Sequence, residues 1–312
     1  MRNRINRETF TKMALYMDTT VSIKVVSEAI SPKKAGQAIQ RAFKAFRHVE
    51  QICSRFTSDS EVMSLIQRIG EPVRVSDTLF EAVRFSLEVA SVSSGAFDPT
   101  VGAVMESYGF NRHYMLRTRQ ETGLPREPVS YKDVLLDEEN RTITLQKPLI
   151  LDLGAVAKGL AIDLAAMELH DFEGFLIDAG GDLYAGGFNE RGEKWKVGIR
   201  HPQRKQEIIG TVELSNEAIC TSGNYERRSP SDPSVHHLFD PKNQKQADGL
   251  VSCTATAPFA MMADAFSTAA FILGAEKGMV LIKEAELEGV LITPSLTILS
   301  TERMEAFLNE YI

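Results

Sequence analysis

The sequence predicts an α+β protein in which mixed, largely antiparallel sheets pack against helices. Candidate strands follow one another directly, as in Trp195–Arg200 and Ile208–Leu214, whereas a parallel fold would alternate each strand with a helix. A few long segments with apolar residues at helical spacing stand between these runs of strands. The chain shows no internal repeat and no low-complexity tract that would indicate a solenoid or a disordered region.

The N-terminal part begins with a strand pattern followed by helix patterns. Thr19–Val26 alternates as a half-buried strand does, and Pro32–Phe56 carries an apolar stripe at helical spacing. Asp77 is the predicted N-cap of a second helix that Gly95 ends. The polar segment Arg112–Pro128 holds two prolines and one glycine and predicts a loop.

From Arg141 onward, strand and helix patterns mix. Ile143–Leu153 is a strand candidate in which Pro148 indicates a break or an edge position. Further strands are predicted over Gly174–Ala179, Trp195–Arg200, Ile208–Leu214, Leu250–Thr254, Gly289–Thr293 and Leu296–Leu299. Helices are predicted over Val156–Leu169, Pro258–Leu273 and Ala275–Ala285.

Length and charge narrow the classes of protein. The chain has 312 residues and a net charge of −7, with 43% hydrophobic and 25% charged residues. This length suffices for one large or two modest domains, and the composition marks no boundary between them. The acidic balance argues against general binding to nucleic acid or to an anionic membrane surface, although it is compatible with a local basic pocket.

Cysteine usage and the N-terminal sequence bear on the cellular compartment. Cys53, Cys220 and Cys253 show neither metal-ligand spacing nor a disulfide framework, which favours a reducing compartment. No apolar run of signal-peptide length follows the basic segment Met1–Lys12, no cysteine precedes Cys53 as a lipid acceptor, and no stretch is apolar enough to span a bilayer. We expect a cytoplasmic protein without a membrane anchor, although an already trimmed secreted protein would show the same features.

The segment Ala263–Thr268 places a carboxylate and a hydroxyl in an otherwise apolar helix. Asp264 and Thr268 are four residues apart and therefore share one helix face. An unpaired buried carboxylate is costly, so Asp264 either pairs with a lysine or arginine, caps a neighbouring backbone, or binds a hard cation. Mg²⁺ suits the last alternative because it takes one or two protein oxygens together with water and phosphate oxygens.

The segment Asp152–Gly159 predicts a strand that turns at Gly154 into a helix whose opening turn carries Lys158. Glycine lets the backbone approach a ligand closely, and free N–H groups at a helix start attract anions. A packing glycine beside a surface lysine would give the same pattern, because short glycine motifs are weak evidence. A phosphate at this segment and a divalent cation at Asp264 together explain both segments most economically.

Four further polar clusters suit either binding or ordinary turns. Gly180–Gly181, between two aspartates, offers a close approach to a ligand or a tight turn. Gly95–Thr100 suits a helix C-cap. Thr221–Arg227 holds donors and an aromatic ring that suit phosphate or ring contacts, and the histidine pair in His236–Pro241 could transfer protons.

Taken together and in order, these segments resemble the ApbE family, the FAD:protein FMN transferases or flavin transferases. The resemblance spans roughly residues 13–300. It rests on SRFTSDSE (54–61), SGAFDPTVG (94–102), DLGAVAKGLAID (152–163), DAGGDLYAGG (178–187), TSGNYER (221–227), HHLFDP (236–241) and ADAFST (263–268). It implies a single ApbE-like, T-fold-related domain over residues 1–312, compatible with two lobes that hold an FAD and Mg²⁺ site between them.

The resemblance implies an Mg²⁺-dependent enzyme that takes FAD as substrate, transfers its FMN moiety to a threonine hydroxyl of a flavin-carrying target protein, and releases AMP. The acceptor threonine would lie in a short D-x-x-[ST]-G-[AS]-[ST]-like sequence. The implied Mg²⁺ ligands are Asp264, Thr268 and the backbone carbonyl of Ala155. The implied FAD contacts are Met17, Glu61, Asp98, Lys158, Asp163, Gly181 and the turn formed by Thr221, Ser222 and Gly223.

Positioning and charge neutralisation dominate such a phosphoryl-type transfer. Asp264 would act through the metal, Lys158 would stabilise the leaving oxygen, and His237 or a nearby aspartate would take the threonine proton. Two alternatives stay open at this point. An Mg²⁺-dependent FAD pyrophosphatase would use water and give FMN and AMP, whereas a non-catalytic FAD-binding protein would need no metal.

The chain departs from the family pattern in two places. The usual Met-Gly-Thr is Met17-Asp18-Thr19 here, which adds a carboxylate near a flavin contact, and the usual D-P-x-T-G is Asp240–Gln244, which lacks the glycine. Many family members are exported lipoproteins. The expected cytoplasmic location of this chain therefore also limits which target proteins it could modify. A cytoplasmic member would modify a cytoplasmic flavoprotein domain, such as a soluble reductase.

Overall fold

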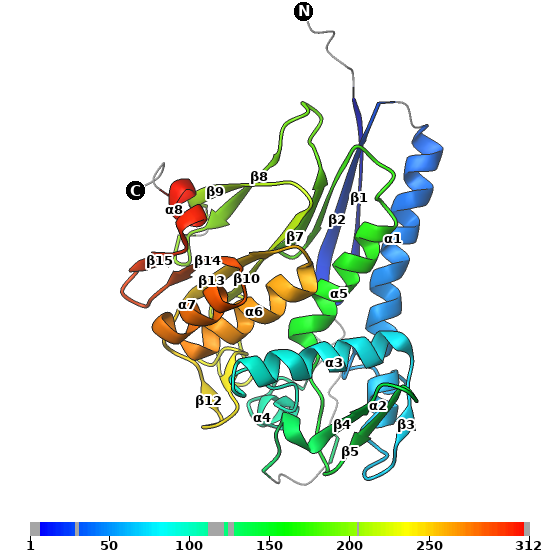
Figure 1. Cartoon of the computed structure of the whole chain (residues 1–312), viewed down its shortest axis with the longest axis vertical. Coiled ribbons are helices and arrows are strands. Elements are labelled where there is room, and N and C mark those ends of the chain that lie inside the picture. Colours follow the sequence, from blue (N-terminus) through cyan, green and yellow to red (C-terminus); the bar gives the residue numbers. More distant parts are fainter. Residues whose placement is uncertain (1–6, 29–30, 112–121, 124–127, 205, 309–312) are drawn as a thin grey trace, which may run out of the picture.

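A computed structural model describes residues 7–28, 31–111, 122–123, 128–204 and 206–308. Within these ranges, the centre is an eight-stranded sheet in the order β1-β2-β6-β7-β10-β13-β14-β15, with antiparallel neighbours throughout (Figure 1). Its strands are β1 (Glu8–Tyr16), β2 (Thr19–Ser27), β6 (Gly174–Ala179), β7 (Asp182–Gly187), β10 (Glu217–Gly223), β13 (Ser252–Ala257), β14 (Glu288–Ile292) and β15 (Ile298–Ser300).

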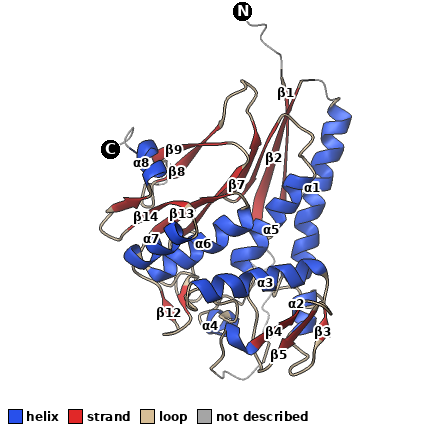
Figure 2. Ribbon diagram, in the orientation of Figure 1, coloured by secondary structure: helices blue, strands red, loops and turns tan. Residues whose placement is uncertain are grey.

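Helices cover one face of this sheet (Figure 2). The long helix α5 (Gly154–Met167) packs between α1 (Pro32–Cys53) and α6 (Ala260–Leu273). The same core buries the inward side chains of β2, such as Val21, Ile23 and Val25. The other helical elements are α2 (Glu61–Leu65), α3 (Asp77–Val92), α4 (Gly102–Ser107), the 3₁₀ turn η1 (Tyr131–Asp133), α7 (Ala275–Glu284) and α8 (Glu302–Leu308).

The opposite face of the sheet is covered by a hairpin and by α8. The hairpin pairs β8 (Trp195–Arg200) with β9 (Ile208–Leu214), and its apolar side chains form a second core with residues of β7, β10 and β14. All six residues of β13 are buried because the strand is central and covered on both faces. Two smaller sheets complete the described structure: β3 (Val73–Arg74), β5 (Thr142–Leu145) and β4 (Val134–Asp137), and β11 (Phe239–Asp240) with β12 (Lys245–Gln246).

The predicted α+β class and several elements are confirmed. Three predicted strands match β6, β8 and β9 residue for residue, because their alternating patterns lie on sheets with one well-buried face. Strands β1, β4, β7 and β10 were not predicted. Strand β1 lies at a sheet edge and is largely exposed, so its sequence carries little alternation.

Two local predictions are wrong, and one lies largely outside the described residues. The strand expected over Ile143–Leu153 ends at Leu145, and the chain then runs irregularly past Pro148 to the start of α5. Ser76 and not Asp77 caps α3, since its Oγ accepts a hydrogen bond from the N–H of Leu79 at 3.2 Å. The loop expected over residues 112–128 falls mostly on positions that the structure does not describe.

The glycine pair Gly180–Gly181 forms the tight turn that was one of its two sequence interpretations. It joins β6 to β7, with Ala179 opposite Asp182, and the two glycines have φ values of +70° and +100°. Positive φ at both central residues suits a two-residue hairpin turn. A Cβ on Gly180 would also lie 2.3 Å from the Oγ1 of Thr19, so the turn is packed against the start of β2.

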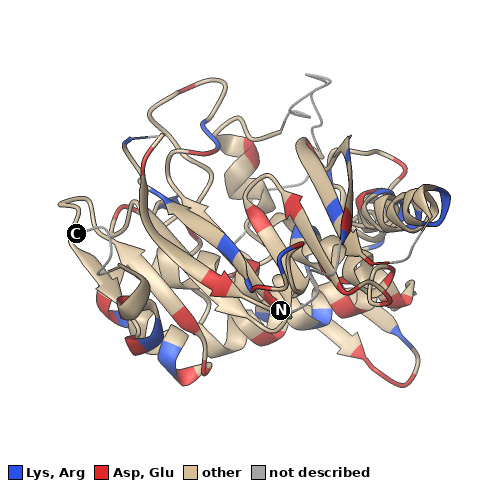
Figure 3. Ribbon diagram, turned by 90° about the horizontal axis from the view of Figure 1, so that it is seen from above, with Lys and Arg blue, Asp and Glu red and all other residues tan. Residues whose placement is uncertain are grey.

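Charged residues of both signs are spread over this protein, which has a net charge of −7. Lys and Arg are interspersed with Asp and Glu along the chain (Figure 3). None of the helices in the described ranges is both long enough and apolar enough to cross a membrane.

Helices α5 and α6 touch backbone to backbone at Gly159. A Cβ added there would lie 2.4 Å from the Cα of Met261 and 2.5 Å from the carbonyl oxygen of Ala260. Real Cβ atoms do not approach backbone so closely, so any side chain at this position would push the two helices apart. Gly159 therefore sets the separation of the helices that carry the two segments singled out from the sequence.

We predict that Gly159→Ala lowers the free energy of unfolding by about 1–3 kcal/mol, because the added methyl overpacks the α5–α6 contact. Gly36→Ala is the matched control. Gly36 lies within α1, and a Cβ there meets only the flexible end of Lys12, with Nζ at 3.2 Å. That control should gain roughly 0.5–1 kcal/mol from helix propensity. Urea unfolding of both variants measures the effects, and equal changes would contradict the packing argument.

Candidate functional site

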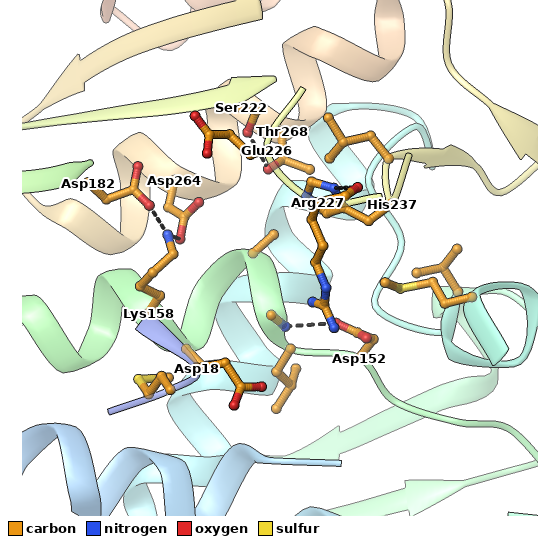
Figure 4. Close-up of a pocket in the computed structure, with 18 of the residues that line it drawn as sticks. Asp18, Asp152, Lys158, Asp182, Ser222, Glu226, Arg227, His237, Asp264 and Thr268 are labelled. Atoms are coloured by element: carbon orange, nitrogen blue, oxygen red, sulfur yellow. Dashed lines mark hydrogen bonds and ion pairs between the residues drawn. The ribbon is translucent and has the colours of Figure 1, made fainter. Parts of the chain in front are cut away.

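A cavity of about 450 Å³ lies where α5, α6 and the end of β10 meet loops from the N-terminal half (Figure 4). Its walls come from segments that are distant in the sequence. The sequence-predicted site residues among its lining are Met17, Asp98, Ala155, Lys158, Thr221, Ser222, Gly223, His237, Asp264 and Thr268. The structure thus gathers most of the predicted residues in one place, at a volume that suits a cofactor-sized ligand.

The N-terminus of α5 opens onto this cavity. Asp152 precedes the helix, and its Oδ1 accepts a hydrogen bond from the N–H of Gly154 at 2.9 Å. Leu153 holds the N-cap position without a side-chain hydrogen bond. The N–H groups of Val156 and Ala157 bond the carbonyl oxygen of Leu153, so within the described residues the N–H of Ala155 is the one left without a partner in this first turn. Leu153, Gly154 and Ala155 all line the cavity, so the positive end of a 14-residue helix faces it.

Helix α6 contributes a carboxylate and a hydroxyl from an otherwise apolar surface. Asp264 and Thr268 are only 6% and 7% exposed, yet both line the cavity, one turn apart. The rest of the helix packs on β10, β13 and α5, which is why it is apolar nearly all round. Helix packing therefore fixes both polar side chains toward the cavity.

Lys158 joins the two helices through ion pairs. Its Nζ lies 2.9 Å from Oδ2 of Asp264 and also pairs with Oδ2 of Asp182 on β7. Burial raises the pKa of Asp264, whereas Lys158 and the N–H of Gly159 oppose this rise. The structure thus realises the lysine pairing that the sequence left open, and the lysine concerned is itself part of the cavity.

Hydroxyl groups of β10 and α6 lie next to one another beside these ion pairs. The Oγ of Ser222 lies 2.9 Å from Oγ1 of Thr268 and 3.0 Å from the Oγ of Ser267. Thr221, Ser222 and Gly223 were expected in a turn, and this is wrong: they form the end of β10, because each pairs with a residue of β13. The N–H of Thr221 also donates to Oδ1 of Asp182 at 3.0 Å.

The residues around Asp264 fit a divalent cation that is shared with a substrate. The described residues hold no group of three or more His, Cys, Asp or Glu placed for a metal. Mg²⁺ does not need one, since one or two carboxylates with phosphate and water oxygens suffice. Ala155 lines the same cavity as Asp264 and Thr268, from the first turn of α5.

A second charged cluster lies around Asp152. Oδ2 of Asp152 accepts a hydrogen bond from Nε of Arg55 at 2.5 Å, and the two side chains are 11% and 3% exposed. Arg227 also lines the cavity near this pair. Arg55 and Arg227 were not predicted as site residues. Both arginines lie within segments that carry the family resemblance, 54–61 and 221–227. The spacing of these segments in the sequence does not show that the two side chains meet.

His237 lies at the cavity wall as a neutral imidazole. Burial and the nearby Arg227 lower the pKa of His237 to about 3. Nδ1 lies 3.3 Å from the carbonyl oxygen of Arg227 and donates to it in the tautomer that this contact requires. Nε2 is then the lone-pair nitrogen, so the ring can accept a proton or a hydrogen bond there.

Asp98 and Met17 line the cavity, and hydrogen bonds to neighbouring residues hold both in place. Oδ1 of Asp98 accepts from the N–H and hydroxyl of Thr100, and Oδ2 accepts from the N–H of Tyr131. Burial raises the pKa of Asp98 although these bonds oppose it. Met17 has a φ of +50°, and its N–H donates to Oε1 of Glu50 at 3.0 Å.

Three predicted FAD contacts lie outside the cavity lining. Glu61 accepts hydrogen bonds from the N–H and Oγ of Ser76, which anchors the start of α3. Asp163 accepts from the N–H groups of Ala260 and Met261 at 2.7 and 2.9 Å and so caps α6 from α5. Gly181 donates its N–H to Oδ1 of Asp178 in the β6–β7 turn. Asp182 lines the cavity instead and was not predicted.

Sequence comparison with known proteins identifies the family of this chain. The sequence model of the ApbE family matches residues 17–291, which is most of the chain. The chain belongs to the ApbE family. Among relatives, the FAD:protein FMN transferase of Klebsiella pneumoniae (strain 342) is 28% identical over 274 residues, which cover 83% of this chain and 83% of that protein.

Solved ApbE structures have the same fold as this ApbE-family chain. The crystal structure of the ApbE protein from Thermotoga maritima superposes with a TM-score of 0.84 at 27% identity, over 96% of this chain and 99% of that one. The flavin transferase ApbE from Vibrio cholerae gives a TM-score of 0.82 at 23% identity, over 97% and 100% of the two chains. The predicted ApbE-like architecture is confirmed.

We predict that the stability of this ApbE-family chain depends on pH through Asp163, the carboxyl group that caps α6. Burial raises the pKa of Asp163 from 3.8 to about 6, so between these values the folded protein holds a proton that the unfolded chain has lost. This group's contribution to stability is therefore fully present at low pH and is lost as the pH rises through about 6. From pH about 7.5 to about 5, the wild type should gain roughly 1.4 kcal/mol relative to Asp163→Asn.

Urea unfolding of the wild type and Asp163→Asn at both pH values tests this expectation. The asparagine keeps one acceptor oxygen for α6 but does not titrate, and all other ionisable groups are common to the two proteins. A stability difference that is the same at both pH values would contradict it.

Proposed function

We propose that this chain transfers the FMN moiety of FAD to a threonine hydroxyl of a target flavoprotein, with Mg²⁺ as cofactor and AMP as the second product. The observation that carries this proposal is the meeting of Asp264, Thr268 and Lys158 beside the α5 N-terminus in one cavity. Membership of the ApbE family supports this reaction, and so does the similarity to the FAD:protein FMN transferase of Klebsiella pneumoniae.

The cavity supplies positioning and charge for a phosphoryl-type transfer. Lys158 and the positive end of the α5 helix dipole suit the pyrophosphate of FAD, because both face the same cavity. Mg²⁺, held by Asp264, Thr268 and the carbonyl of Ala155, would neutralise charge on the phosphate oxygens. Asp182 holds the Lys158 ammonium in place between β7 and α6.

In the proposed step, the threonine oxygen forms a bond to the phosphorus of the FMN half. The bond from that phosphorus to the oxygen bridging to AMP breaks, and AMP leaves with the bridging oxygen. Nε2 of His237 takes the threonine proton, since the ring is neutral and Nδ1 is committed to the Arg227 carbonyl. Lys158 stabilises the negative charge that develops on the leaving oxygen.

The proposal includes a cellular compartment and a class of acceptor protein. Cys53, Cys220 and Cys253 are free and buried, which suits a reducing compartment, and a cytoplasmic flavoprotein domain is the proposed acceptor. Incubation with FAD, Mg²⁺ and a candidate acceptor domain, followed by in-gel flavin fluorescence, tests the reaction class. A covalently fluorescent acceptor supports transfer, free FMN alone supports hydrolysis of FAD, and unchanged FAD supports binding without turnover.

We predict that Asp264→Ala reduces FMN transfer by at least roughly 100-fold while the protein stays folded, because the cation loses its carboxylate ligand. Lys158 keeps Asp182 as an ion-pair partner in this variant. Asp171→Ala is the matched control, since that carboxylate is 87% exposed and lies outside the cavity. Transfer rates across an Mg²⁺ titration and the melting temperature are measured. Transfer at the native rate in limiting Mg²⁺ would contradict the metal assignment.

A further inference from the structure

Arg227 presents to the cavity a guanidinium that no described residue satisfies by a hydrogen bond or an ion pair. The side chain starts just after β10, and its guanidinium reaches toward Asp152 at the start of α5 (Figure 4). Within the described ranges it makes no side-chain hydrogen bond and no ion pair. Two aromatic rings hold it instead, since the guanidinium carbon lies 5.6 Å from the ring centre of Phe56 and 5.8 Å from that of Phe110.

A second arginine lies against the same wall with one donor unused. Arg55 is 4% exposed, and its Nε and Nη2 donate to Asp152 and to the carbonyl oxygen of Phe110, both at 2.5 Å. Its Nη1 is buried without a hydrogen-bond partner among the described residues. The ring of Phe56 lies 4.3 Å from the Arg55 guanidinium carbon, so Phe56 contacts both arginines. An unsatisfied buried donor is costly, which indicates a function for this cluster.

The nearby carboxylates act on the Arg227 guanidinium without forming a described hydrogen bond or ion pair to it. Asp152 commits Oδ2 to Arg55 and Oδ1 to the N–H of Gly154, so it acts on Arg227 only through space. Asp18 also acts on Arg227 through space and has a partner of its own. Burial lowers the pKa of Arg227; Arg55 adds to this effect, whereas Asp152 and Asp18 oppose it. Within the described residues, the Arg227 guanidinium therefore keeps its N–H donors for an anion in this part of the cavity.

We propose that Arg227, supported by Arg55 and the α5 N-terminus, forms a phosphate subsite for the pyrophosphate group of the flavin nucleotide, apart from the cluster of Lys158, Asp182 and Asp264. The guanidinium fork matches the paired oxygens of a phosphate, and the aromatic rings hold the fork without using its N–H groups. Arg227 also holds His237 through its carbonyl oxygen, so the subsite lies beside the proposed proton acceptor. This inference rests on the proposed function, since FAD is the ligand.

Binding measurements on matched ligand pairs test the subsite without any turnover. The full-length protein is titrated calorimetrically with FMN and riboflavin, and with AMP and adenosine, because each pair differs only in the phosphate. In the wild type the phosphorylated ligand of at least one pair should bind more tightly. Arg227→Met should weaken FMN or AMP binding by about 10- to 100-fold, as loss of a charge-assisted hydrogen-bond pair does, and leave riboflavin and adenosine unchanged.

Two further variants separate a phosphate contact from a folding defect. Arg228→Met is the matched control, since the adjacent arginine is exposed, donates to the carbonyl of Ser234 and does not line the cavity. It should leave all four affinities unchanged. Arg227→Lys keeps the charge but loses the fork, so it should bind the phosphorylated ligand with an intermediate affinity.

The pair that responds identifies which phosphate of FAD contacts Arg227. An equal loss for the phosphorylated and unphosphorylated ligands would overturn the subsite, because it would assign Arg227 to the ring or to the fold. Unchanged FMN and AMP affinities in Arg227→Met would overturn it as well. Neither outcome depends on the acceptor assay, so failure of FMN transfer and failure of this subsite are distinguishable.

Discussion

The ion pairs of Lys158 with Asp182 and Asp264 are the interaction on which the site depends. They join α5, β7 and α6, so a side chain from each of three elements meets at one point of the cavity. Buried carboxylates without a partner would be costly, and their mutual proximity requires a cation between them. In the proposed reaction, a divalent cation beside these carboxylates would supply the positive charge that the phosphate oxygens need.

The packing of the helices makes these ion pairs possible. Gly159 lets the backbones of α5 and α6 touch, and Asp163 caps α6 from the neighbouring helix. The sheet beneath, with β10 and β13 at its centre, fixes the rotation of α6 so that Asp264 and Thr268 face the cavity. Residues outside the cavity lining, such as Gly159 and Asp163, therefore set the geometry of those that line it.

The sequence predicted the fold class and the meeting of Asp264, Thr268 and Lys158 in one place, because those signals are local. Four-residue spacing placed Asp264 and Thr268 on one helix face, and the Gly154 turn placed Lys158 near a helix start. Arg55 and Arg227 escaped prediction because their proximity to Asp152 comes from contacts across the fold. The same reason applies to β10, where strand pairing with β13 overrides the turn-like composition of Thr221–Gly223. The ApbE resemblance supplied the substrate, which spacing alone does not encode.

In the proposed reaction, a divalent cation held by Asp264 and Thr268 engages the pyrophosphate of FAD. A crystal structure with FAD and Mn²⁺, in which the anomalous signal locates the metal, tests this arrangement. We expect one Mn²⁺ at about 2.1–2.2 Å from a carboxylate oxygen of Asp264, the hydroxyl of Thr268 and a pyrophosphate oxygen. Mn²⁺ bound away from Asp264, or FAD bound outside the cavity, would contradict it.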